Sequence, residues 1–367
     1  MRFAVFDETK DGETRVALVP DAVKMLLKKQ HAVSVQTGAG RAASIPDAQF
    51  EAAGAQLVAD PNQLAAAADC LVRVRAITVE EAAAFPEGKA LIGFLAPLRN
   101  PELIAVLAKR RLTSFSLDAI PRISRAQSMD TLSSMATIAG YKAVLLAADA
   151  LPKFLPMLTT AAGTIRPAQA LILGAGVAGL QAIATSRRMG AVVEAFDVRS
   201  AVKEQIKSLG ATFVEIPNQE NLEDKGGYAK QVSAETLAKQ QQLLHERAKL
   251  ADYIISTAQV PGKPAPRLIT KEMVADMKPG SVIVDLAAES GGNCELTKAG
   301  QTVCVHGVTI IGPTNLPARM PLDASRMFAR NLATFILEIT NEKGFTMDWE
   351  NEIFAGTCVT HDGEITR

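Results

Sequence analysis

Short runs rich in β-branched and aromatic residues alternate with alanine- and leucine-rich stretches along the chain, and this alternation constrains the fold most. A strand-like run at 2–6 is followed by a helix-like stretch from Pro20 and another strand-like run at 32–36, and the order repeats to about residue 117. Strand–helix–strand repetition builds a parallel sheet with helices on both faces. We therefore predict a first α/β domain of this kind.

A second series of the same kind runs from residue 169 to 311. A long apolar stretch at 135–155 precedes it, and a long amphipathic stretch at 323–340 follows it. Two long helices in these places indicate that the chain leaves the first domain, builds the second and returns. We predict an α/β protein with two Rossmann-like domains and parallel sheets, separated by a cleft and joined by the two long helices. The predicted domains are residues 1–126 with 312–367, and residues 127–311.

Composition excludes several classes of protein. The 39 lysines and arginines balance 39 aspartates and glutamates, so no net field draws the chain to nucleic acid or an anionic membrane. Asp7 and Glu8 interrupt the apolar run that a signal peptide would continue, and Asp149, Lys153 and two prolines break the segment most like a membrane span. The four cysteines are scattered, without the spacing of a zinc site or disulfide framework. These features favour a protein of a reducing cytosol, without a membrane span or a metal.

The most specific local motif is Gly174-x-Gly176-x-x-Gly179, which follows a strand-like run and opens a helix. In this context Gly174 allows a tight turn, Gly176 lets the backbone approach a pyrophosphate, and Gly179 lets helix and strand pack closely. Asp197 ends the next strand-like run about 20 residues on, where a carboxylate accepts from a ribose 2′-OH and repels a 2′-phosphate. The motif therefore predicts NAD rather than NADP, a preference that Arg199 slightly weakens.

A similar pattern, Gly38-x-Gly40-x-x-Ala43, follows an earlier strand-like run, and Asp60 ends the next one. Because Pro46 is expected to begin the following helix, these glycines would not lie directly on a helix N-terminus. We interpret the pattern as a structural turn, with a second dinucleotide site as the alternative.

The segment PRISRAQSMDTLSS, residues 121–134, gathers polar side chains with almost no bulky apolar residue to bury. Histidine is scarce: of the four, His31 alone could lie beside the strand ends expected to line the cleft of the first domain. A dehydrogenase that acts on an alcohol or amine needs a group that takes the proton when hydride leaves. No Ser/His/Asp or Cys/His arrangement for nucleophilic catalysis is evident either.

Two further segments each allow two interpretations, one functional and one structural. Glu289 follows a strand-like run, where α/β sheets bind ligands, and is either a functional acid or a solvated carboxylate. The polar stretch 221–242 holds Gly226 and Gly227 before Tyr228. It is either a flexible loop that lays Tyr228 over a cofactor, with the glycines as a hinge, or a solvated loop and charged helix.

Several longer segments together resemble domain I, the NAD(H)-binding component of proton-translocating nicotinamide nucleotide transhydrogenase. They are PRISRAQSMD, GAGVAGLQAIAT, GGYAKQ, PGKPAP, MKPGSVIVDLAAESGGNC and RNLATF, and the resemblance runs from residue 1 to about 360. That family is related to alanine dehydrogenase, which shares the two-domain fold and the segment ETRVAL at residues 13–18.

Two departures separate the chain from alanine dehydrogenase. That enzyme carries a catalytic histidine where this chain has Leu95, Ala96 and Pro97, and its substrate-binding lysine corresponds to Arg73. Without the histidine, pyruvate reduction lacks its acid, whereas direct hydride transfer between two nicotinamides needs no proton donor at the reacting carbon. The resemblance therefore implies a transhydrogenase component. The alternatives are an alanine-dehydrogenase-like NAD-dependent enzyme and a non-catalytic NAD(H)-sensing module.

The resemblance also implies which residues act, chiefly by proximity and orientation. Arg122 and its neighbours would orient the nicotinamide of NAD(H), Gln127 would help to place the NADP nicotinamide of a partner, and Tyr228 would lie on a loop that closes over the nucleotide. The expected catalytic residues are Gln127, Arg122, Asp130, Ser133 and Tyr228. The expected cofactor contacts, glycine motif included, are Arg122, Ile123, Ser124, Arg125, Gly174, Gly176, Val177, Gly179, Asp197, Val198, Arg199, Gly227, Gln240 and Gln259. Gln259 departs from the apolar residue expected at its position.

Partners follow from the same resemblance. The chain shows no convincing NADP site, so NADP(H) is expected only on a partner, the NADP(H)-binding domain III. We expect a homodimer that docks on a membrane domain II as a peripheral subunit, on the cytoplasmic side of the bacterial inner membrane.

Overall fold

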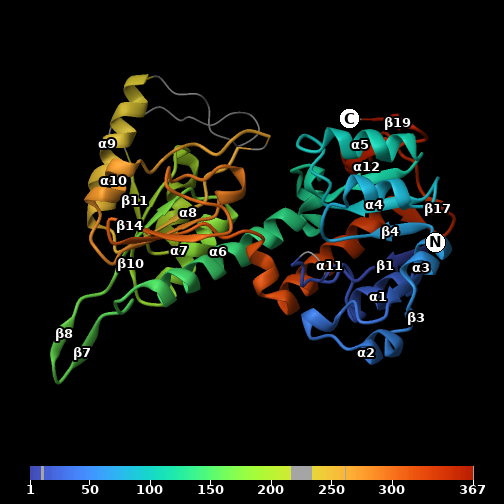
Figure 1. Ribbon diagram of the computed structural model, residues 1–367, viewed down its shortest axis with the longest axis horizontal. Coiled ribbons are helices and arrows are strands. Elements are labelled where there is room, and N and C mark those ends of the chain that lie inside the picture. Colours follow the sequence, from blue (N-terminus) through green and yellow to red (C-terminus); the bar gives the residue numbers. More distant parts are fainter. Residues whose placement is uncertain (10–11, 216–233, 261, 367) are drawn as a thin grey trace. The chain divides into compact units, whose positions relative to one another are not determined.

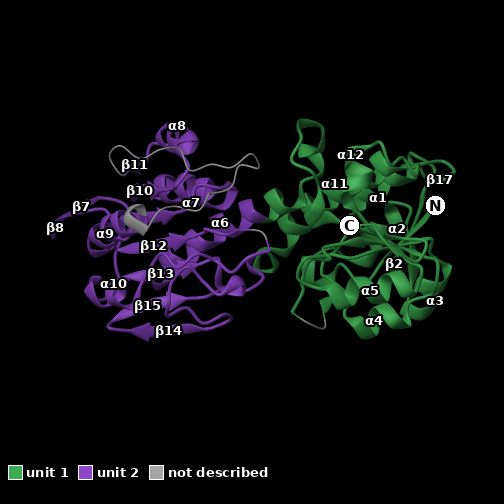
Figure 2. Ribbon diagram, turned by 90° about the horizontal axis from the view of Figure 1, so that it is seen from above, with its two compact units in different colours: residues 1–135, 317–367 green, residues 136–316 purple. Residues whose placement is uncertain are grey.

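The computed structural model describes residues 1–9, 12–215, 234–260 and 262–366. The chain forms two compact units (Figure 2): unit 1 is Met1–Met135 with Pro317–Arg367, and unit 2 is Ala136–Leu316. The sequence-based boundaries after residues 126 and 311 lie nine and five residues before these crossings, which follow Met135 and Leu316. The first crossing falls inside a continuous helix, α6 (Thr131–Ala150), rather than in the segment before it.

Unit 1 is built on an eight-stranded sheet in the order β19-β18-β6-β5-β4-β1-β2-β3. Strands β6 to β3 are parallel, while β18 and β19 join antiparallel at the β6 edge. In chain order the parallel strands read 3-2-1-4-5-6, so the winding direction reverses between β1 and β4. The strands are β1 (Arg2–Val5), β2 (Ala32–Gln36), β3 (Gln56–Val58), β4 (Cys70–Val72), β5 (Ala90–Gly93), β6 (Thr113–Ser116), β18 (Cys358–His361) and β19 (Glu364–Ile365).

The helices of unit 1 begin where proline and polar caps predict. Four of them start on proline, whose fixed φ suits the first helical position and which has no N–H to leave unpaired. The helices are α1 (Pro20–Leu27), α2 (Asp47–Ala52), α3 (Pro61–Ala67), α4 (Val79–Ala84), α5 (Pro101–Lys109), α11 (Pro321–Ile339) and α12 (Glu352–Thr357).

The second long helix, α11, does not join the two units. It lies wholly in unit 1, and the chain returns from unit 2 through the 3₁₀ turn η7 (Leu316–Arg319) instead. Helix α11 stays in unit 1 because its apolar face is buried there: the ring of Phe335 packs edge-on against Phe115 of β6, at 6.1 Å between centroids. Phe354 of α12 contacts the same ring, and Trp349 packs edge-on against Phe354. A short hairpin of β16 (Thr340–Asn341) and β17 (Gly344–Phe345) follows α11.

Unit 2 repeats the same winding. Its seven-stranded sheet has the order β11-β10-β9-β12-β13-β15-β14, which again contains 3-2-1-4-5-6 in parallel, with β14 antiparallel at one edge. The strands are β9 (Gln169–Leu173), β10 (Val192–Phe196), β11 (Thr212–Val214), β12 (Tyr253–Ser256), β13 (Val282–Asp285), β14 (Thr302–Val305) and β15 (Val308–Ile311). The prediction of two Rossmann-like α/β domains is confirmed.

Both faces of the unit 2 sheet are covered, as a parallel sheet requires. Alternate residues of each strand enter different cores: Ile172 and Ile255 pack with α6 and α7 (Val177–Arg188), whereas Leu171 and Ile254 pack with α9 (Ala234–Leu250) and α10 (Lys271–Asp276). Helix α8 (Lys203–Ser208) follows β10. Figure 1 shows the hairpin of β7 (Leu158–Thr160) and β8 (Gly163–Ile165) extending away from this sheet.

Helix α6 differs in length from the predicted stretch. It begins at Thr131 and ends at Ala150, because Pro152 disfavours helical backbone in the residue before it. By length and composition, α6 alone among the helices of the described residues could span a membrane. Its residues Ala143, Val144 and Ala147 are buried in the core of unit 2, as in a core helix of a globular domain.

Candidate functional site

The predicted nucleotide site of unit 2 lies where the winding of its sheet reverses. Strand β9 pairs with β10 on one side and β12 on the other, so the connections leaving β9 and β12 diverge and open a crevice at the carboxyl ends of the strands. Gly174 follows β9, Asp197 follows β10 and Thr257 follows β12. Residues that lie far apart in the chain therefore meet at one edge of the sheet.

The three glycines of the motif differ in what surrounds them. Gly174 has φ +96°, and a Cβ there would lie 2.6 Å from Oγ1 of Thr257. A Cβ on Gly179 would lie 1.9 Å from the carbonyl oxygen of Gly174, so helix and strand approach as closely as the motif predicts. A Cβ on Gly176 would meet no atom of the described residues within 4 Å. Two glycines are thus needed for packing, and the third faces open space.

The N-terminus of α7 faces the same space. Gly176 is its N-cap residue, no side chain of the described residues caps the helix, and its first turn holds no acid. The first N–H groups of a helix lack intrahelical acceptors and carry partial positive charge. Open space at Gly176 and uncapped amides behind it fit the pyrophosphate of a dinucleotide.

A glycine that the motif does not contain also positions α7. A Cβ on Gly140 of α6 would lie 2.1 Å from the carbonyl oxygen of Ala178, in the first turn of α7. Helix α6 therefore packs backbone to backbone against the predicted phosphate-binding turn. Sequence analysis missed Gly140, since nothing local distinguishes it from an ordinary helix glycine.

Asp197 is already fully engaged. Its Oδ2 accepts from the N–H of Ala175 at 2.7 Å and from the guanidinium of Arg199 at 2.9 Å. Its Oδ1 accepts from the N–H and Nε of Arg199, both at 2.9 Å. Asp197 is 9% exposed. The carboxylate thus ties the glycine turn to the end of β10 and forms a bidentate ion pair with Arg199.

Buried polar residues that sequence analysis did not single out hold the neighbouring strand ends. Asp285, at the end of β13, is fully buried and accepts from Ser256 Oγ at 3.0 Å and Thr297 Oγ1 at 2.7 Å, and from two backbone N–H groups. Asn293, also fully buried, accepts from the N–H of Ala258 and donates to its carbonyl, at 3.1 and 2.8 Å. These bonds fix the segment after β12 at the rim of the crevice.

The other predicted contacts of unit 2 are placed as follows. Val177 is 42% exposed at the first position of α7, and Val198 is half-buried beside Asp197. Gln259 is exposed and donates to the carbonyl of Leu286 at 3.0 Å. Gln240 of α9 is 6% exposed, and its Nε2 finds no acceptor among the described residues. Gly227 and Tyr228 lie outside the described residues.

Glu289, left open between two roles, lies in the 3₁₀ turn η6 (Ala288–Ser290) after β13. Its side chain is exposed and accepts from the N–H of Asn315 at 3.2 Å. A contact of this kind fits a solvated loop carboxylate. Among the described residues, no three His, Cys, Asp or Glu side chains gather closely enough to hold a metal ion.

The polar cluster of residues 121–134 lies in unit 1, and some of its members have structural partners. Asp130 precedes α6 and caps it: its Oδ1 accepts from the N–H of Ser133 at 2.8 Å and its Oδ2 from the Ser133 hydroxyl. Ser134 donates to Asn331 of α11 at 2.6 Å, and Asn331 donates to the carbonyl of Ser128. Asp130 and Ser133, which were predicted to be catalytic, therefore form the hydrogen bonds that cap the N-terminus of α6.

Several other members of the cluster have exposed side chains. Arg125 contacts Glu338 of α11 at 3.3 Å and donates to Asn351 at 2.8 Å. Arg122, Ser124 and Gln127, in or beside the 3₁₀ turn η4 (Ser124–Met129), are exposed, and Ile123 is half-buried. Of the predicted site residues in this cluster, Arg122, Ser124, Arg125 and Gln127 are therefore exposed to a ligand of unit 1.

Unit 1 has its own reversal point, between β1 and β4, and charged side chains fill it. Glu8 is 2% exposed and accepts from the N–H groups of Val74 and Arg75, at 2.8 and 3.1 Å, with Arg73 Nε at 3.3 Å. Burial raises the pKa of Glu8, although Arg73 acts to lower it. Arg73 also contacts Glu81 at 3.4 Å. Its guanidinium is thus held by two carboxylates.

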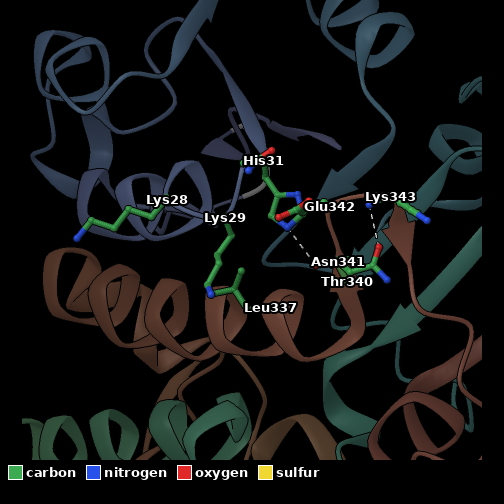
Figure 3. A pocket seen from close by; sticks show the side chains of 9 residues that line it. Lys28, Lys29, His31, Leu337, Thr340, Asn341, Glu342 and Lys343 are labelled. Atoms are coloured by element: carbon green, nitrogen blue, oxygen red, sulfur yellow. Dashed lines mark hydrogen bonds between the residues drawn. The ribbon is translucent and has the colours of Figure 1, made fainter.

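The segment after β5 carries no imidazole. The N–H groups of Leu95 and Ala96 donate to Asp118 at 3.1 and 3.2 Å, which closes the loop onto the sheet. His31, which could have lined this edge, lies before β2 and so at the opposite edge. His31 and Glu342 both line a pocket of about 630 Å³. In Figure 3 the side chains of Lys28 and Lys343 extend away from the ring of His31. The His31 Nε2 pairs with the Thr340 hydroxyl at 3.2 Å.

The second glycine pattern forms a turn of another kind. It follows β2, away from the reversal point, and α2 begins only at Asp47. The carboxylate of Asp47 accepts from the N–H of Gly38, at 2.9 and 3.1 Å, where a phosphate would have to bind. A Cβ on Gly40 would lie 2.5 Å from the carbonyl oxygen of Ile45. These contacts favour the interpretation as a structural turn.

Comparisons with known proteins agree with this architecture. The sequence matches the models of the N-terminal domain of alanine dehydrogenase/PNT over residues 4–139 and of the C-terminal domain over residues 143–367. It is 46% identical to an NAD(P) transhydrogenase alpha-subunit polypeptide of Rhodospirillum rubrum, over 100% of this chain and 97% of that protein. The crystal structure of transhydrogenase from Sinorhizobium meliloti superposes with a TM-score of 0.91 at 42% identity, over 100% of both chains. An L-alanine dehydrogenase shares the fold, with a TM-score of 0.82 at 24% identity over 100% of this chain and 96% of that one. The chain belongs to the alanine dehydrogenase/PNT family, among relatives that are transhydrogenase alpha subunits.

Proposed function

We propose that the chain is the NAD(H)-binding component of a proton-translocating transhydrogenase and passes hydride between NADH and NADP⁺ held on a partner domain. The observation that carries the proposal is the crevice of unit 2, where Gly176 leaves open space before the uncapped N-terminus of α7 and Asp197 ends the next strand. When bound there, the nicotinamide supplies the hydride. The residues of the chain bind and orient it.

Each group in unit 2 has a task in this proposal. The first amides of α7 bind the pyrophosphate, and Asp197 faces the adenosine ribose. The buried Nε2 of Gln240 lacks an acceptor among the described residues, so an acceptor on the nucleotide would remove the cost of leaving it unpaired. Asp285 and Asn293 keep the opposite rim, at Ala258, in place.

Resemblance to the family supports the remaining assignments. Arg122, Ile123, Ser124 and Arg125 are the proposed nicotinamide contacts, and Gln127 the residue that places the partner's nicotinamide. Asp130 and Ser133 would support them through the start of α6. Gly227 and Tyr228 are proposed nucleotide contacts on resemblance alone. Catalysis of this kind rests on bringing two rings together in the right orientation.

An alanine-dehydrogenase-like activity is less well supported. Reduction of a 2-oxo acid needs a proton donor, and the segment Leu95–Pro97 offers none. The side chain that corresponds to the substrate-binding lysine, Arg73, contacts Glu8 and Glu81 instead of facing a substrate carboxylate freely. Hydride transfer between two nicotinamides requires neither group.

The proposal includes partners and a location. NADP(H) would be held only on a partner, domain III, and the chain would act as a homodimer docked on membrane domain II. It would be peripheral, on the cytoplasmic side of the bacterial inner membrane. The names of the relatives, which describe them as an alpha subunit, support a complex of several subunits.

The test is a stopped-flow experiment with the purified chain, NADH, an NAD analogue and an NADP-loaded domain III from a recognised transhydrogenase. We expect rapid NADH-dependent reduction of the analogue through the bound NADP. If nucleotide binds but no hydride passes, with the native partner as well as the foreign one, the sensing module replaces the proposal. Steady NADH oxidation with pyruvate and ammonium would instead favour the dehydrogenase.

A further inference from the structure

We propose that Arg199 controls the selectivity of the site between NAD(H) and NADP(H), and that Asp197 restrains it by holding its guanidinium in the bidentate ion pair. The inference rests on the proposed function, because it concerns the same nucleotide site. In this view the pair, rather than Asp197 alone, decides whether a ribose 2′-phosphate is accepted.

The hydrogen bonds of Asp197 show why the pair matters. A carboxylate has about four acceptor positions, and N–H donors from Ala175 and Arg199 take four here, at 2.7 to 2.9 Å. A ribose hydroxyl can be accepted only if a donor leaves. The bond from Ala175 shapes the glycine turn and that from the Arg199 N–H is backbone, so the guanidinium is the donor that can move.

The charges lead to the same conclusion. A lone carboxylate would repel a 2′-phosphate, but the paired guanidinium neutralises it, so repulsion is weaker than from an unpaired aspartate. A freed guanidinium beside the ribose has the planar fork that binds phosphate oxygens in pairs. The Arg199 side chain is 21% exposed against 6% for Asp197, so it can turn toward a ligand without opening the core.

Two substitutions should therefore shift selectivity in opposite directions. Asp197→Asn keeps an oxygen for the N–H of Ala175 and the size of the side chain, but it no longer holds the guanidinium by charge. Arg199→Gln leaves the Asp197 carboxylate without its guanidinium partner, so it accepts a ribose hydroxyl more readily and repels a phosphate more strongly. Arg188→Gln, in the exposed last turn of α7, removes the same charge elsewhere in unit 2 and serves as the control.

The experiment measures the dissociation constants of NADH and NADPH by nucleotide fluorescence, using the full chain, its three single variants and the double variant Asp197→Asn/Arg199→Gln. We expect Asp197→Asn to bind NADPH at least about tenfold more tightly than the wild type does. The double variant should lose this gain. Arg199→Gln should raise the preference for NADH by at least about threefold, and Arg188→Gln should change neither ratio.

Three results would overturn the inference. The first is an Asp197→Asn variant that still binds NADH but binds NADPH no more tightly than the wild type does. The second is a gain of NADPH affinity that persists in the double variant. The third is an Arg199→Gln variant in which the ratio of the dissociation constants of NADH and NADPH is unchanged. If Asp197→Asn does not fold, as circular dichroism would show, Arg199→Gln alone decides. Failure of the wild-type chain to bind NADH would contradict the proposed function itself, a result distinct from these three.

Discussion

Replacing Gly176 by alanine should weaken NADH binding without unfolding the protein, whereas replacing Gly179 by alanine should destabilise unit 2. The two positions lie in one motif, three residues apart, but differ in surroundings. A Cβ on Gly176 meets no atom of the described residues within 4 Å, while one on Gly179 would lie 1.9 Å from the carbonyl oxygen of Gly174 and 2.8 Å from its carbonyl carbon. The pair thus separates the predicted contact with a pyrophosphate from internal packing.

The magnitudes follow from these distances. To restore ordinary contact, α7 and the glycine turn must separate by more than about 1 Å in Gly179→Ala, and overpacking of this kind costs about 1–3 kcal/mol. In a domain of this size that lowers the melting temperature by roughly 2–12 °C. Gly176 has φ −75°, which alanine adopts freely. In Gly176→Ala, alanine is a poorer N-cap residue than glycine, which destabilises the folded protein, but it also makes the unfolded chain less flexible, which stabilises the folded protein. Because these two effects oppose each other, the free energy of unfolding should change by less than about 1 kcal/mol.

Calorimetry and NADH titration form the assay. The protein's single tryptophan, Trp349, lies in unit 1, so tryptophan fluorescence would not report directly on unit 2. We expect Gly176→Ala to melt like the wild type and to bind NADH at least about tenfold more weakly, because its Cβ occupies the approach of the pyrophosphate. Wild-type affinity in Gly176→Ala would refute the assignment of the pyrophosphate, and wild-type melting of Gly179→Ala would refute the packing argument.

Three further predictions use other regions of the chain. Gly140→Ala should lower the unfolding free energy of unit 2, measured by calorimetry, by about 1–3 kcal/mol, because its Cβ would lie 2.1 Å from the Ala178 carbonyl oxygen. Gly356→Ala is the control, because the atom nearest to its Cβ would lie 3.6 Å away, at an ordinary contact distance. Equal stability of the two variants would contradict the close packing at Gly140. Asp252→Asn should cost about 1–3 kcal/mol near neutral pH, because the 6% exposed carboxylate accepts from Lys153 and Lys278 at 2.8 and 3.0 Å. Burial acts to raise the pKa of Asp252, but these lysines and the backbone N–H of Gln169 lower it overall. The advantage of the wild type should therefore be complete above about pH 5 and disappear as pH falls through the lowered pKa, and a difference that grows in acid would exclude this cause. Gln127→Asn should slow hydride transfer to the partner's NADP by about 10- to 100-fold with an unchanged dissociation constant for NADH, and an unaltered rate would remove Gln127 from the site.

Features that depend on local sequence were predictable. The strands of both sheets follow from short apolar runs because burial on both faces demands them, and proline set the starts of α1, α3 and α5. The turn at Gly174 and the close packing at Gly179 were also expected, since strand, glycine spacing and helix lie within one short segment.

Features that depend on distant partners were not predictable. Gly140 contacts Ala178, and Asn293 holds Ala258, across separations that no local pattern encodes. The pairing of Arg199 with Asp197 involves near neighbours, but whether the guanidinium folds back or extends depends on how the end of β10 is packed. The same limit explains α11, which the sequence marked as a connection: its amphipathic pattern shows that one face is buried, not in which unit.

Because unit 2 is inserted into unit 1, the order of synthesis differs from the order of completion. Strand β6 precedes unit 2 in the chain, yet β6 receives its neighbour β18, and Phe115 its ring contacts with Phe335 and Phe354, only from residues that follow unit 2. At about 5–20 residues per second, residues 317–367 take roughly 3–10 s to synthesise. Until those residues have been synthesised, Phe115 lacks its ring contacts with Phe335 and Phe354. A chaperone that binds aromatic side chains should therefore engage the nascent chain at β6 more than at unit 2.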